Sequence, residues 1–450
     1  MSSIPQLTTR PLGAAETCRT AAARALALAR RLASDSLLQK SVLSVFDQAV
    51  VSGTSFAASI IIGRACGRTE LGLYSLALSL VLFARGIQEQ LVCAPYMIYC
   101  GRRKGEAAAT FAGSSLVHQI LLLALACLCL AGMSVTGIGP ELVQPLMWLL
   151  LMTAPLILLR DYVRQMSFAQ IELPTAIAMD VFIAAVQIGG FLALAWFGML
   201  EVRTALIVMA AGCGLATIGW LAGKRLPMIV RISAAVADWG HNWPFAKWAL
   251  ASQLLACTTP FIMPWVVALT HGEAATGVLA ACSTLVGLSN MFMMGLANFL
   301  SPKAAHAFAE GGLPELKSIL RKTGLLFLIT LGAASVAGFL IGDWVATLVY
   351  GPNFAGTGAI IGVLATSILA NSLGVTFGNG LWAMERPSAS FRADVVSLVV
   401  TIVSTIVLIP ALGTLGAALA MLAGTSSDAL VRYWALRQVM HEVEIERDAS

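Results

Sequence analysis

The chain has 450 residues, of which 58% are hydrophobic and only 11% are charged, and its mean hydropathy is +0.84. Soluble domains carry about 25% charged residues, so this composition excludes a soluble enzyme, a disordered protein and a nucleic-acid-binding protein. The net charge of +5 is small. The nine cysteines form no CxxC pair and most lie in apolar runs. Neither a disulfide framework, a metal site nor a cofactor is therefore predicted.

Twelve apolar segments have about the 20 residues needed to cross a bilayer. They lie at 42–63, 71–98, 108–131, 143–160, 174–198, 204–223, 246–269, 277–300, 323–349, 356–383, 393–410 and 413–434. Because lipid offers no partner to backbone polar groups, these segments must be helices. The predicted fold class is an all-α integral membrane protein with twelve transmembrane helices. No small-residue cleavage site follows the first apolar run, so a removed signal peptide is not expected.

The basic residues predict the orientation. If the segments alternate across the membrane, 24 of the 28 Lys and Arg residues fall on the side of the N-terminus. Positive residues gather on the cytoplasmic side, so both termini are expected there. The longest loop on the opposite side, 132–142, has eleven residues. It leaves no room for an external catalytic domain, and the protein is not expected to be an enzyme.

The two halves of the chain resemble each other. FAQIELPTAIAMD (168–180) matches LWAMERPSASFRAD (381–394), which pairs Asp180 with Asp394, and Gly72 parallels Gly277. Six helices per repeat give parallel repeats, which form two lobes around a central cavity in transporters. The predicted domains are a cytoplasmic amphipathic N-terminal segment (1–41), an N-lobe (42–223), a cytoplasmic linker (224–245), a C-lobe (246–434) and a cytoplasmic tail (435–450).

A polar hexapeptide, RGIQEQ at 85–90, interrupts the second span. Each flanking apolar run is too short to cross alone, so the hexapeptide must lie at membrane depth, where a charge costs about 2.5–3.5 kcal/mol. Arg85, Gln88 and Glu89 share one helical face. One hypothesis is an anion-binding Arg85 that faces a central cavity and is held by Glu89. The alternative is an Arg85–Glu89 ion pair that only tethers helices.

Other polar residues fall on helical faces in the apolar segments. Asn290 lies 205 residues after Arg85 and shares a face with Asn298, while Gln48, Ser52 and Ser55 form a stripe on the first helix. Such a stripe could equally serve helix packing. Four aspartates near the predicted helix ends, Asp47, Asp180, Asp394 and Asp428, are expected at the membrane interface. Arg160 and Arg164 are expected in a cytoplasmic loop.

Three segments carry a resemblance to a known family. They are IIGRACGRTELGLYSLALSL (61–80), SPKAAHAFAEGGLPELKSILRK (301–322) and LVYGPNFAGTGAIIGVLATSILANSLG (348–374). Their order and content resemble the first loop, the loop after helix eight and the turn before helix ten of the polysaccharide and oligosaccharidyl-lipid flippases. This family, which includes O-antigen flippase-like proteins, belongs to the multidrug/oligosaccharidyl-lipid/polysaccharide exporter superfamily.

The resemblance implies transfer of a polyprenyl-diphosphate-linked glycan from the inner to the outer leaflet of a bacterial plasma (inner) membrane by alternating access. Arg85, with Arg64 at the exit side, would attract the diphosphate, and Asn290, Asn298, Gln48 and the serines would receive sugar hydroxyls. The implied partners are this lipid-linked glycan, the bilayer, and a polysaccharide polymerase with its chain-length machinery. No nucleic acid is expected.

Three alternatives differ in what they require. A cation-coupled multidrug exporter of the same superfamily would need an unpaired acidic group in its cavity, whereas Glu89 has Arg85 one turn away. A membrane-embedded glycosyltransferase would need a large catalytic loop. A structural scaffold would leave the polar hexapeptide and the duplication unexplained.

Overall fold

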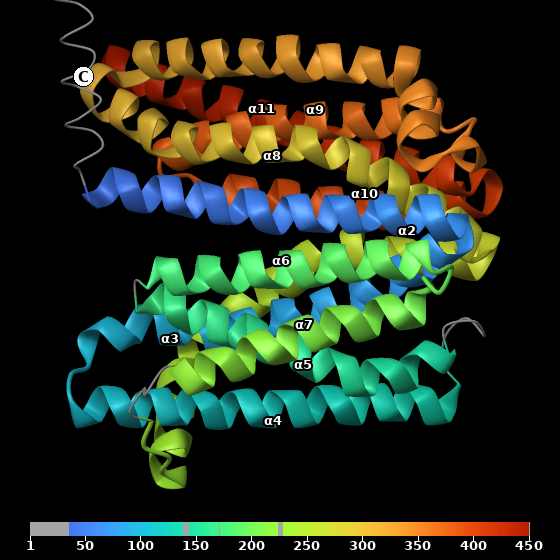
Figure 1. The fold of residues 1–450 in the computed structure, drawn as a ribbon. Coiled ribbons are helices and arrows are strands. Elements are labelled where there is room, and N and C mark those ends of the chain that lie inside the picture. Colours follow the sequence, from blue (N-terminus) through green and yellow to red (C-terminus); the bar gives the residue numbers. More distant parts are fainter. Residues whose placement is uncertain (1–35, 138–143, 171, 224–227, 450) are drawn as a thin grey trace, which may run out of the picture.

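The computed structural model describes residues 36–137, 144–170, 172–223 and 228–449, and these residues form helices and short connections without a strand (Figure 1). Nine of the described helices are long and apolar enough to cross a membrane. The protein is therefore a multi-pass, all-helical membrane protein, as its composition predicts. The predicted N-terminal segment 1–41 lies almost wholly outside the described residues, as do parts of the loop 132–142 and of the linker 224–245.

The first half of the chain contains five long helices. They are α2 (Ser36–Gln88), α4 (Glu106–Thr136), α5 (Gln144–Ala169), α6 (Leu173–Trp196) and α7 (Val202–Gly223). Three short elements join α2 to α4: the π-helical turn η1 (Glu89–Cys93), α3 (Ala94–Tyr99) and the 3-10 turn η2 (Cys100–Arg102). The π-helical turn thus begins within the polar hexapeptide predicted to lie at membrane depth.

The second half contains α8 (Ile232–Tyr350), η4 (Pro352–Phe354), α9 (Gly358–Ala383), α10 (Pro387–Leu412) and α11 (Thr414–Ala449). The longest helices are not continuous. Gly67 interrupts α2, and Gly272 and Gly312 interrupt α8, each with a positive φ. Glycine adopts this conformation without the steric cost that a Cβ imposes, so each of these sites reverses the chain within an otherwise helical stretch.

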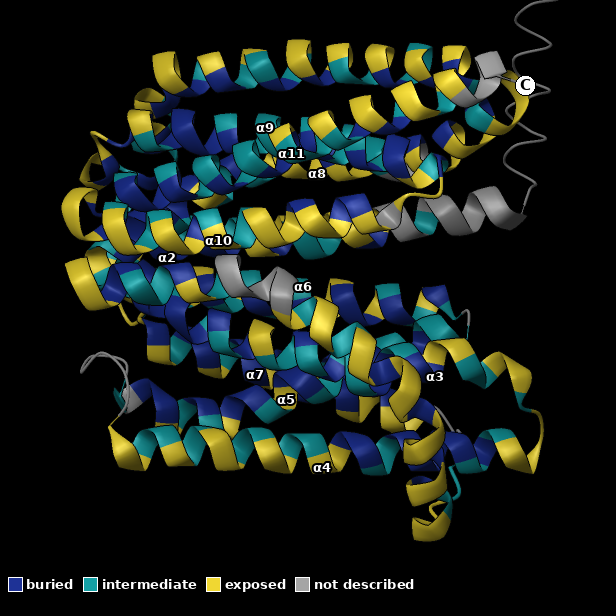
Figure 2. Ribbon diagram, turned by 180° about the vertical axis from the view of Figure 1, so that it is seen from behind, coloured by how far each residue is buried: buried dark blue, intermediate teal, exposed yellow. Residues whose placement is uncertain are grey.

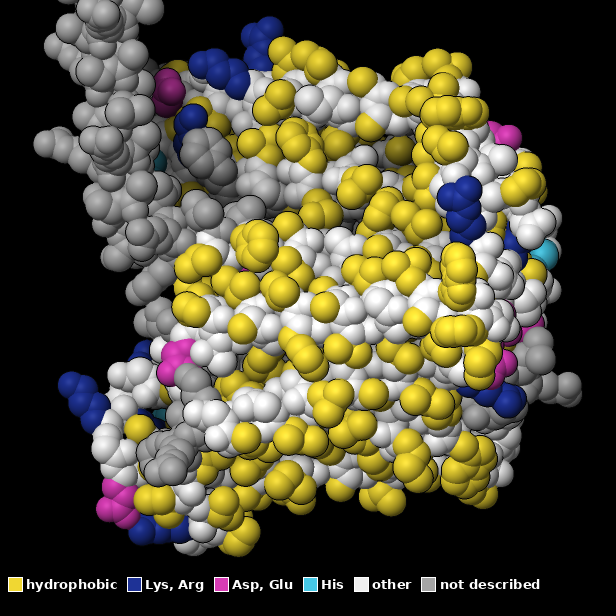
Figure 3. Space-filling view, in the orientation of Figure 1, with side chains coloured by type: hydrophobic (Ala, Val, Ile, Leu, Met, Phe, Trp, Pro, Cys, Tyr) yellow, Lys and Arg dark blue, Asp and Glu magenta, His cyan; other side chains and the backbone are white. Residues whose placement is uncertain are grey.

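The helices run side by side, with α4 to α7 on one side of the molecule and α9 to α11 on the other (Figure 1). Helix α2 packs against α5, α6 and α7 and also against α8, which in turn packs against α9, α10 and α11. On the face shown in Figure 3, charged side chains gather at the two ends of the helices, and the broad middle is hydrophobic. This distribution is expected of a protein whose middle contacts lipid.

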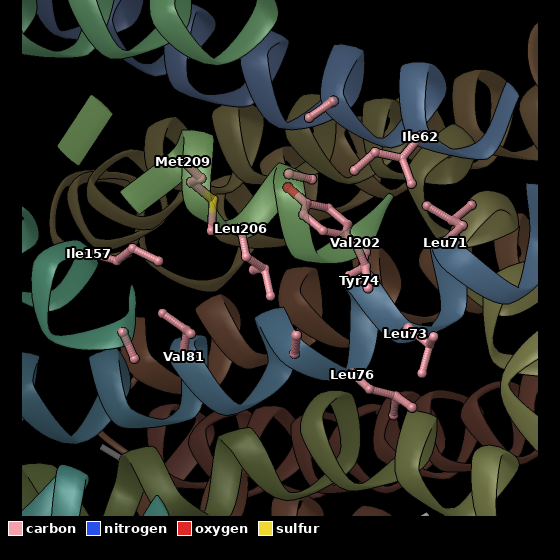
Figure 4. Packing of buried hydrophobic residues seen from close by; sticks show 14 of the residues in the cluster. Ile62, Leu71, Leu73, Tyr74, Leu76, Val81, Ile157, Val202, Leu206 and Met209 are labelled. Atoms are coloured by element: carbon pink, nitrogen blue, oxygen red, sulfur yellow. The ribbon is translucent and has the colours of Figure 1, made fainter. Parts of the chain in front are cut away.

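The core surrounds the second part of α2. Leu71, Tyr74 and Val81 of α2 belong to one hydrophobic cluster with Val202 and Leu206 of α7, and all five are buried (Figure 4). Buried residues lie where helices face one another, whereas the outward faces are exposed (Figure 2). The seven described cysteines are free thiols, and Cys93, Cys213 and Cys282 are buried. The prediction that cysteines serve as small core residues is confirmed for these three.

Candidate substrate-binding region

Arg85 of α2 is held by a carboxylate from a neighbouring helix. Its Nε lies 3.1 Å from Oδ2 of Asp161 on α5, and the Asp161 Oδ1 accepts a hydrogen bond of 2.8 Å from Arg160. The predicted partnership with Glu89 is wrong, because the i, i+4 spacing places two side chains on one face without deciding which carboxylate lies nearest. The Arg85 side chain remains 32% exposed.

The charges continue into a buried network. Asp180 of α6 accepts hydrogen bonds from Arg160 and, at 2.6 Å, from Nε of Arg164, and Arg164 also pairs with Asp47 of α2. Asp47, Asp180 and Arg164 are buried. The prediction that Arg164 lies in a loop is wrong, because α5 continues past its predicted end at residue 160 to Ala169.

Three arginines and three aspartates alternate along this network, so its formal charge is zero. Partners surround each carboxylate because an unpaired charge inside a bundle is very costly. The network connects both parts of α2 with α5 and α6. It also fixes the side of Arg85 that carries Nε, while the two terminal nitrogens of that guanidinium have no protein partner among the described residues.

Gln88 serves packing. Its amide nitrogen donates to the carbonyl oxygen of Leu158 on α5 at 3.0 Å, and its carbonyl oxygen accepts a hydrogen bond of 3.2 Å from Gln119 on α4. Gln88 and Gln119 are buried. Gln88 thus connects α2 with α4 and α5 through hydrogen bonds that replace those to water. This geometry favours a structural role for Gln88 over the predicted contact with substrate.

The polar stripe on α2 is present, but most of its hydrogen bonds are local. Gln48 donates to Ser52 at 3.1 Å, and Ser55 donates to the carbonyl oxygen of Val51 at 3.1 Å. Gln48 and Ser55 are exposed. Farther along the stripe, buried Ser59 shares hydrogen bonds with Tyr350 at 3.0 Å and Thr284 at 3.3 Å, both on α8. The stripe therefore joins α2 to α8 at one end and is open at the other.

The remaining predicted residues are not gathered around Arg85. Asn290 on α8 and Arg64 on α2 are exposed, and the Asn298 side chain lies outside the described residues. Among the predicted site residues, hydrogen bonds link only Gln48 with Ser52 in the described part of the chain.

A polar cavity that the sequence did not reveal lies between α2, α8 and α11. We call it the α2–α8 cavity. It has a volume of about 380 Å³ and is lined by Ser75, Met263, Pro264, Thr276, Leu279, Ala280, Ser283, Thr284 and Met421. Beside it, the indole nitrogen of Trp265 donates to Ser79 at 2.8 Å. Thr276, Ser283 and Thr284 share one face of α8, whereas Ser75 lies on α2, so local periodicity gives no sign that these two groups meet.

Within the described ranges, no group of three or more His, Cys, Asp or Glu side chains could hold a metal ion. The binding chemistry available here is that of guanidinium, amide and hydroxyl groups. Such groups suit a ligand with anionic oxygens and many hydroxyls.

Comparisons with known proteins agree with these features. No family model matches the chain. A curated protein, "Probable low-salt glycan biosynthesis flippase Agl15" of Haloferax volcanii, is 19% identical over 176 residues, which span 39% of this chain and 37% of that protein. The match thus covers well under half of the relative's length.

Solved structures match nearly the whole chain. An inward-facing multidrug resistance transporter of the MATE family, in the MOP superfamily, gives a TM-score of 0.71 at 15% identity, with 88% of this chain and 95% of that chain covered. The lipid II flippase MurJ, in an inward closed conformation, gives 0.72 at 14% identity, with 89% and 87% covered. The chain therefore has the fold of the MOP superfamily transporters. The resemblance to that superfamily and to its glycan flippases, noted from the sequence, is confirmed.

Proposed function

We propose that this protein is a flippase that moves a lipid-diphosphate-linked oligosaccharide from the inner to the outer leaflet for polysaccharide biosynthesis, such as that of O-antigen or exopolysaccharide. The names of two relatives support the substrate class, since one is a glycan biosynthesis flippase and the other a lipid II flippase. In this proposal the protein moves its substrate without chemical change and is not an enzyme. A polysaccharide polymerase and its chain-length machinery would act on the product.

The observation that carries the proposal is the state of Arg85. One side of its guanidinium is fixed by Asp161, and the other side is accessible and unpaired in the described part of the chain. A charge retained at membrane depth marks a substrate pathway more often than a packing contact. Guanidinium groups bind phosphate oxygens through two parallel charge-assisted hydrogen bonds. Arg85 is thus oriented for a diphosphate.

Sugar groups need a polar path. A hydroxyl that crosses hydrocarbon without a partner costs about 2–7 kcal/mol, so an oligosaccharide requires groups that replace water. We assign this role to Gln48, Ser52 and Ser55 on α2 and to Asn290 and Asn298 on α8, with Arg64 at the exit side. The exposure of Gln48, Ser55 and Asn290 supports a water-filled cleft, because polar side chains in lipid-facing positions would be costly.

The proposed architecture has twelve spans in two six-helix lobes, 42–223 and 246–434, around this cleft. The kinks at Gly67, Gly272 and Gly312 support it, because they divide two of the nine described membrane-length helices into five segments. Further support comes from four pairs of glycines with positive φ, about 205–215 residues apart: Gly67 and Gly272, Gly105 and Gly312, Gly137 and Gly351, and Gly198 and Gly413. The basic residues support cytoplasmic termini, and we assign the protein to a bacterial inner membrane on the basis of the proposed substrate.

The proposed mechanism is alternating access. The structural likeness is greater to an inward-facing MATE transporter, with a TM-score of 0.71, than to an outward-facing one, with 0.56 over 90% of this chain. This difference supports a conformation that opens toward the cytoplasm. Substrate would enter there, and rocking of the two lobes would release it outside.

The alternative is a cation-coupled exporter of drugs or other small molecules, with which the MATE-like fold is compatible. Such a protein needs an acidic group available to a cation. All five buried aspartates in the described ranges pair with arginine: Asp47, Asp161, Asp180, Asp238 and Asp428. This pairing favours the flippase, whereas Glu89, which is half-buried and pairs with no arginine in the described ranges, is the acidic group that an exporter would use.

The test is replacement of Arg85. Arg85→Ala leaves Asp161 paired with Arg160, so the protein should still fold and reach the membrane. We expect export of the glycan to fall by about tenfold or more, since a hydrogen bond to a charged group contributes about 1.5–3 kcal/mol. Lipid-linked oligosaccharide should accumulate on the inner leaflet.

Two controls accompany this variant. Arg203→Ala removes an exposed arginine from the start of α7 and should leave export unchanged. Arg85→Lys should restore part of it. Normal export by Arg85→Ala at equal protein levels would contradict the proposal, and drug sensitivity on deletion without any glycan defect would favour the exporter.

A further inference from the structure

A second cavity, of about 470 Å³, lies where the end of α9 and the start of α10 meet the middle parts of α8 and α11. We call it the C-terminal cavity. It is lined by Ser301, Val375, Gly378, Asn379, Trp382, Ser390, Phe391, Asp394 and Arg432. At its wall, Nη2 of Arg432 lies 2.5 Å from Oδ1 of Asp394, and Nε of Arg432 lies 2.9 Å from Oδ1 of Asp428. None of the residues proposed above to bind substrate lines it.

The equivalent aspartate in the first half of the chain lies in a different environment. Asp394 occupies the position that Asp180 occupies in the first sequence repeat. The Asp180 side chain is fully buried between Arg160 and Arg164, whereas the Asp394 side chain is 46% exposed and pairs with Arg432 alone. A carboxylate needed only for packing would be enclosed as Asp180 is. The open copy retains free acceptor positions that face the cavity.

A buried hydroxyl in the same wall has no partner. Ser390 is 5% exposed, and its Oγ makes no hydrogen bond. Buried polar groups are hydrogen-bonded in most proteins, so this enclosed hydroxyl is an exception in the wall of the cavity. Asn379 adds a second polar group, because its amide nitrogen donates to Val375 at 3.0 Å while its side-chain oxygen stays available.

The rim of the cavity is aromatic. Trp382 is 64% exposed and Phe391 is 59% exposed, and they come from the end of α9 and the start of α10. Gly378 leaves room for Arg432 in the wall of the cavity, because a Cβ there would overlap the Arg432 guanidinium. Apolar rings combined with a few fixed polar groups are the usual composition of a small-molecule site.

The charged residues in the wall of the cavity favour a neutral ligand. Asp394 and Asp428 with Arg432 sum to one negative charge, which disfavours a phosphate. Both carboxylates already contact a guanidinium, which disfavours a simple cation. A neutral ligand with many hydroxyls can donate to Asp394 and to the side-chain oxygen of Asn379. The apolar faces of its rings can lie on Trp382 and Phe391.

We infer that the C-terminal cavity binds sugar residues of the lipid-linked oligosaccharide before it crosses the membrane, at a distance from the diphosphate contact at Arg85. This inference rests on the proposed flippase function and adds the part of the protein that distinguishes a glycan-bearing lipid from the bare lipid. Arg85 would bind both lipids, and the C-terminal cavity would add affinity only for the one that carries sugars.

The experiment measures the binding of two probes to the purified full chain in nanodiscs. One probe is polyprenyl diphosphate without sugars, and the other is the same lipid with the oligosaccharide, extracted from cells that make it. We expect the intact protein to bind the sugar-bearing lipid more tightly. Trp382→Ala and Asp394→Asn should each reduce this preference by about tenfold, equivalent to 1.4 kcal/mol, without changing affinity for the bare lipid. Trp434→Ala, which removes an exposed tryptophan outside the cavity, is the control.

The outcomes separate the two proposals. An unchanged preference for the sugar-bearing lipid in both cavity variants overturns the inference while the flippase function stands. A change in cation dependence without a change in sugar preference also overturns it and assigns the cavity to a cation. If the intact protein binds neither lipid, the proposed function fails and the inference fails with it.

Discussion

Gly72 and Gly277 lie against each other where α2 and α8 cross, and each backbone occupies the space that a side chain on the other helix would need. A Cβ on Gly72 would overlap the carbonyl oxygen of Glu273, and a Cβ on Gly277 would overlap that of Arg68. The contact is reciprocal, because Gly277 follows Gly72 by 205 residues and Glu273 follows Arg68 by the same interval. Small residues allow such close helix crossings in membranes. Each glycine follows a kink by five residues, at Gly67 and Gly272.

This crossing predicts a conformational effect for Gly72→Val. In the proposed topology the crossing of α2 and α8 closes the outer side of the α2–α8 cavity. A larger side chain at residue 72 should therefore favour the outward-open state. We expect Ser75→Cys, which reports on the cavity, to react about tenfold faster with an impermeant thiol reagent applied from outside, because the substitution penalises only the closed state. The assay uses a Cys66→Ser background, and export should fall.

The matched control is Gly53→Val on the same helix, where a Cβ would meet no atom within 4 Å. It should label at the parent rate. Equal labelling of Ser75→Cys with and without Gly72→Val would show that the crossing does not restrict access from outside.

Much of this fold could be predicted from the sequence because lipid imposes a simple rule. Long apolar segments must be helices, and the equivalence of Gly72 with Gly277 and of Asp180 with Asp394 is visible in the residues alone. Which helices become neighbours is not visible. Arg85 finds Asp161, 76 residues farther along the chain, because α5 packs beside α2, and no local periodicity encodes that contact.

The site was predicted less well than the fold for the same reason. A helical wheel places Gln88 on the same face as Arg85, but in the structure Gln88 is enclosed by α4 and α5. The α2–α8 cavity and the C-terminal cavity each combine residues from at least three helices. One signal was available in the sequence. Arg160 and Arg164 lie one helical turn apart directly after an apolar run, with Asp161 between them.

The orientation of the chain gives a prediction that uses reporter fusions. Both termini should lie in the cytoplasm, so a fluorescent protein fused after residue 450 should fluoresce, and alkaline phosphatase at the same position should be inactive. Phosphatase inserted at the exposed turn after Gly198, between α6 and α7, should be active. The reverse pattern of phosphatase activity at the two positions would invert the topology and remove the assignment of the cavities to membrane sides.

Asp343 of α8 predicts a local effect on stability. Its Oδ1 accepts hydrogen bonds from the backbone nitrogens of Gly356 at 2.5 Å and Thr357 at 2.9 Å, at the start of α9. Loss of such a cap costs about 0.5–2 kcal/mol. Asp343→Ala should therefore lower the melting temperature of the purified protein by a few degrees, and Asp343→Asn should recover much of the loss. Equal melting temperatures for the parent and Asp343→Ala would show that water replaces this cap.

The buried network predicts a larger effect that depends on charge balance. Arg164→Ala leaves Asp47 buried without its partner and removes one of the two arginines around Asp180. Breaking one side of a buried ion pair costs about 3–5 kcal/mol, so this variant should unfold at a clearly lower temperature. The exposed pair of Arg231 with Glu106 provides the control, because Arg231→Ala should cost about 1 kcal/mol or less.

The double variant Asp47→Asn/Arg164→Ala separates charge from packing. If the penalty arises from an orphaned carboxylate, neutralising Asp47 should recover part of the stability lost in Arg164→Ala, and the two substitutions should be non-additive in a double-mutant cycle. Strict additivity would instead assign the loss to the missing side-chain volume. Because Arg85 belongs to the same network only through Asp161 and Arg160, Asp47→Asn alone should leave binding of bare polyprenyl diphosphate unchanged, which separates the structural part of the network from the guanidinium assigned to the substrate.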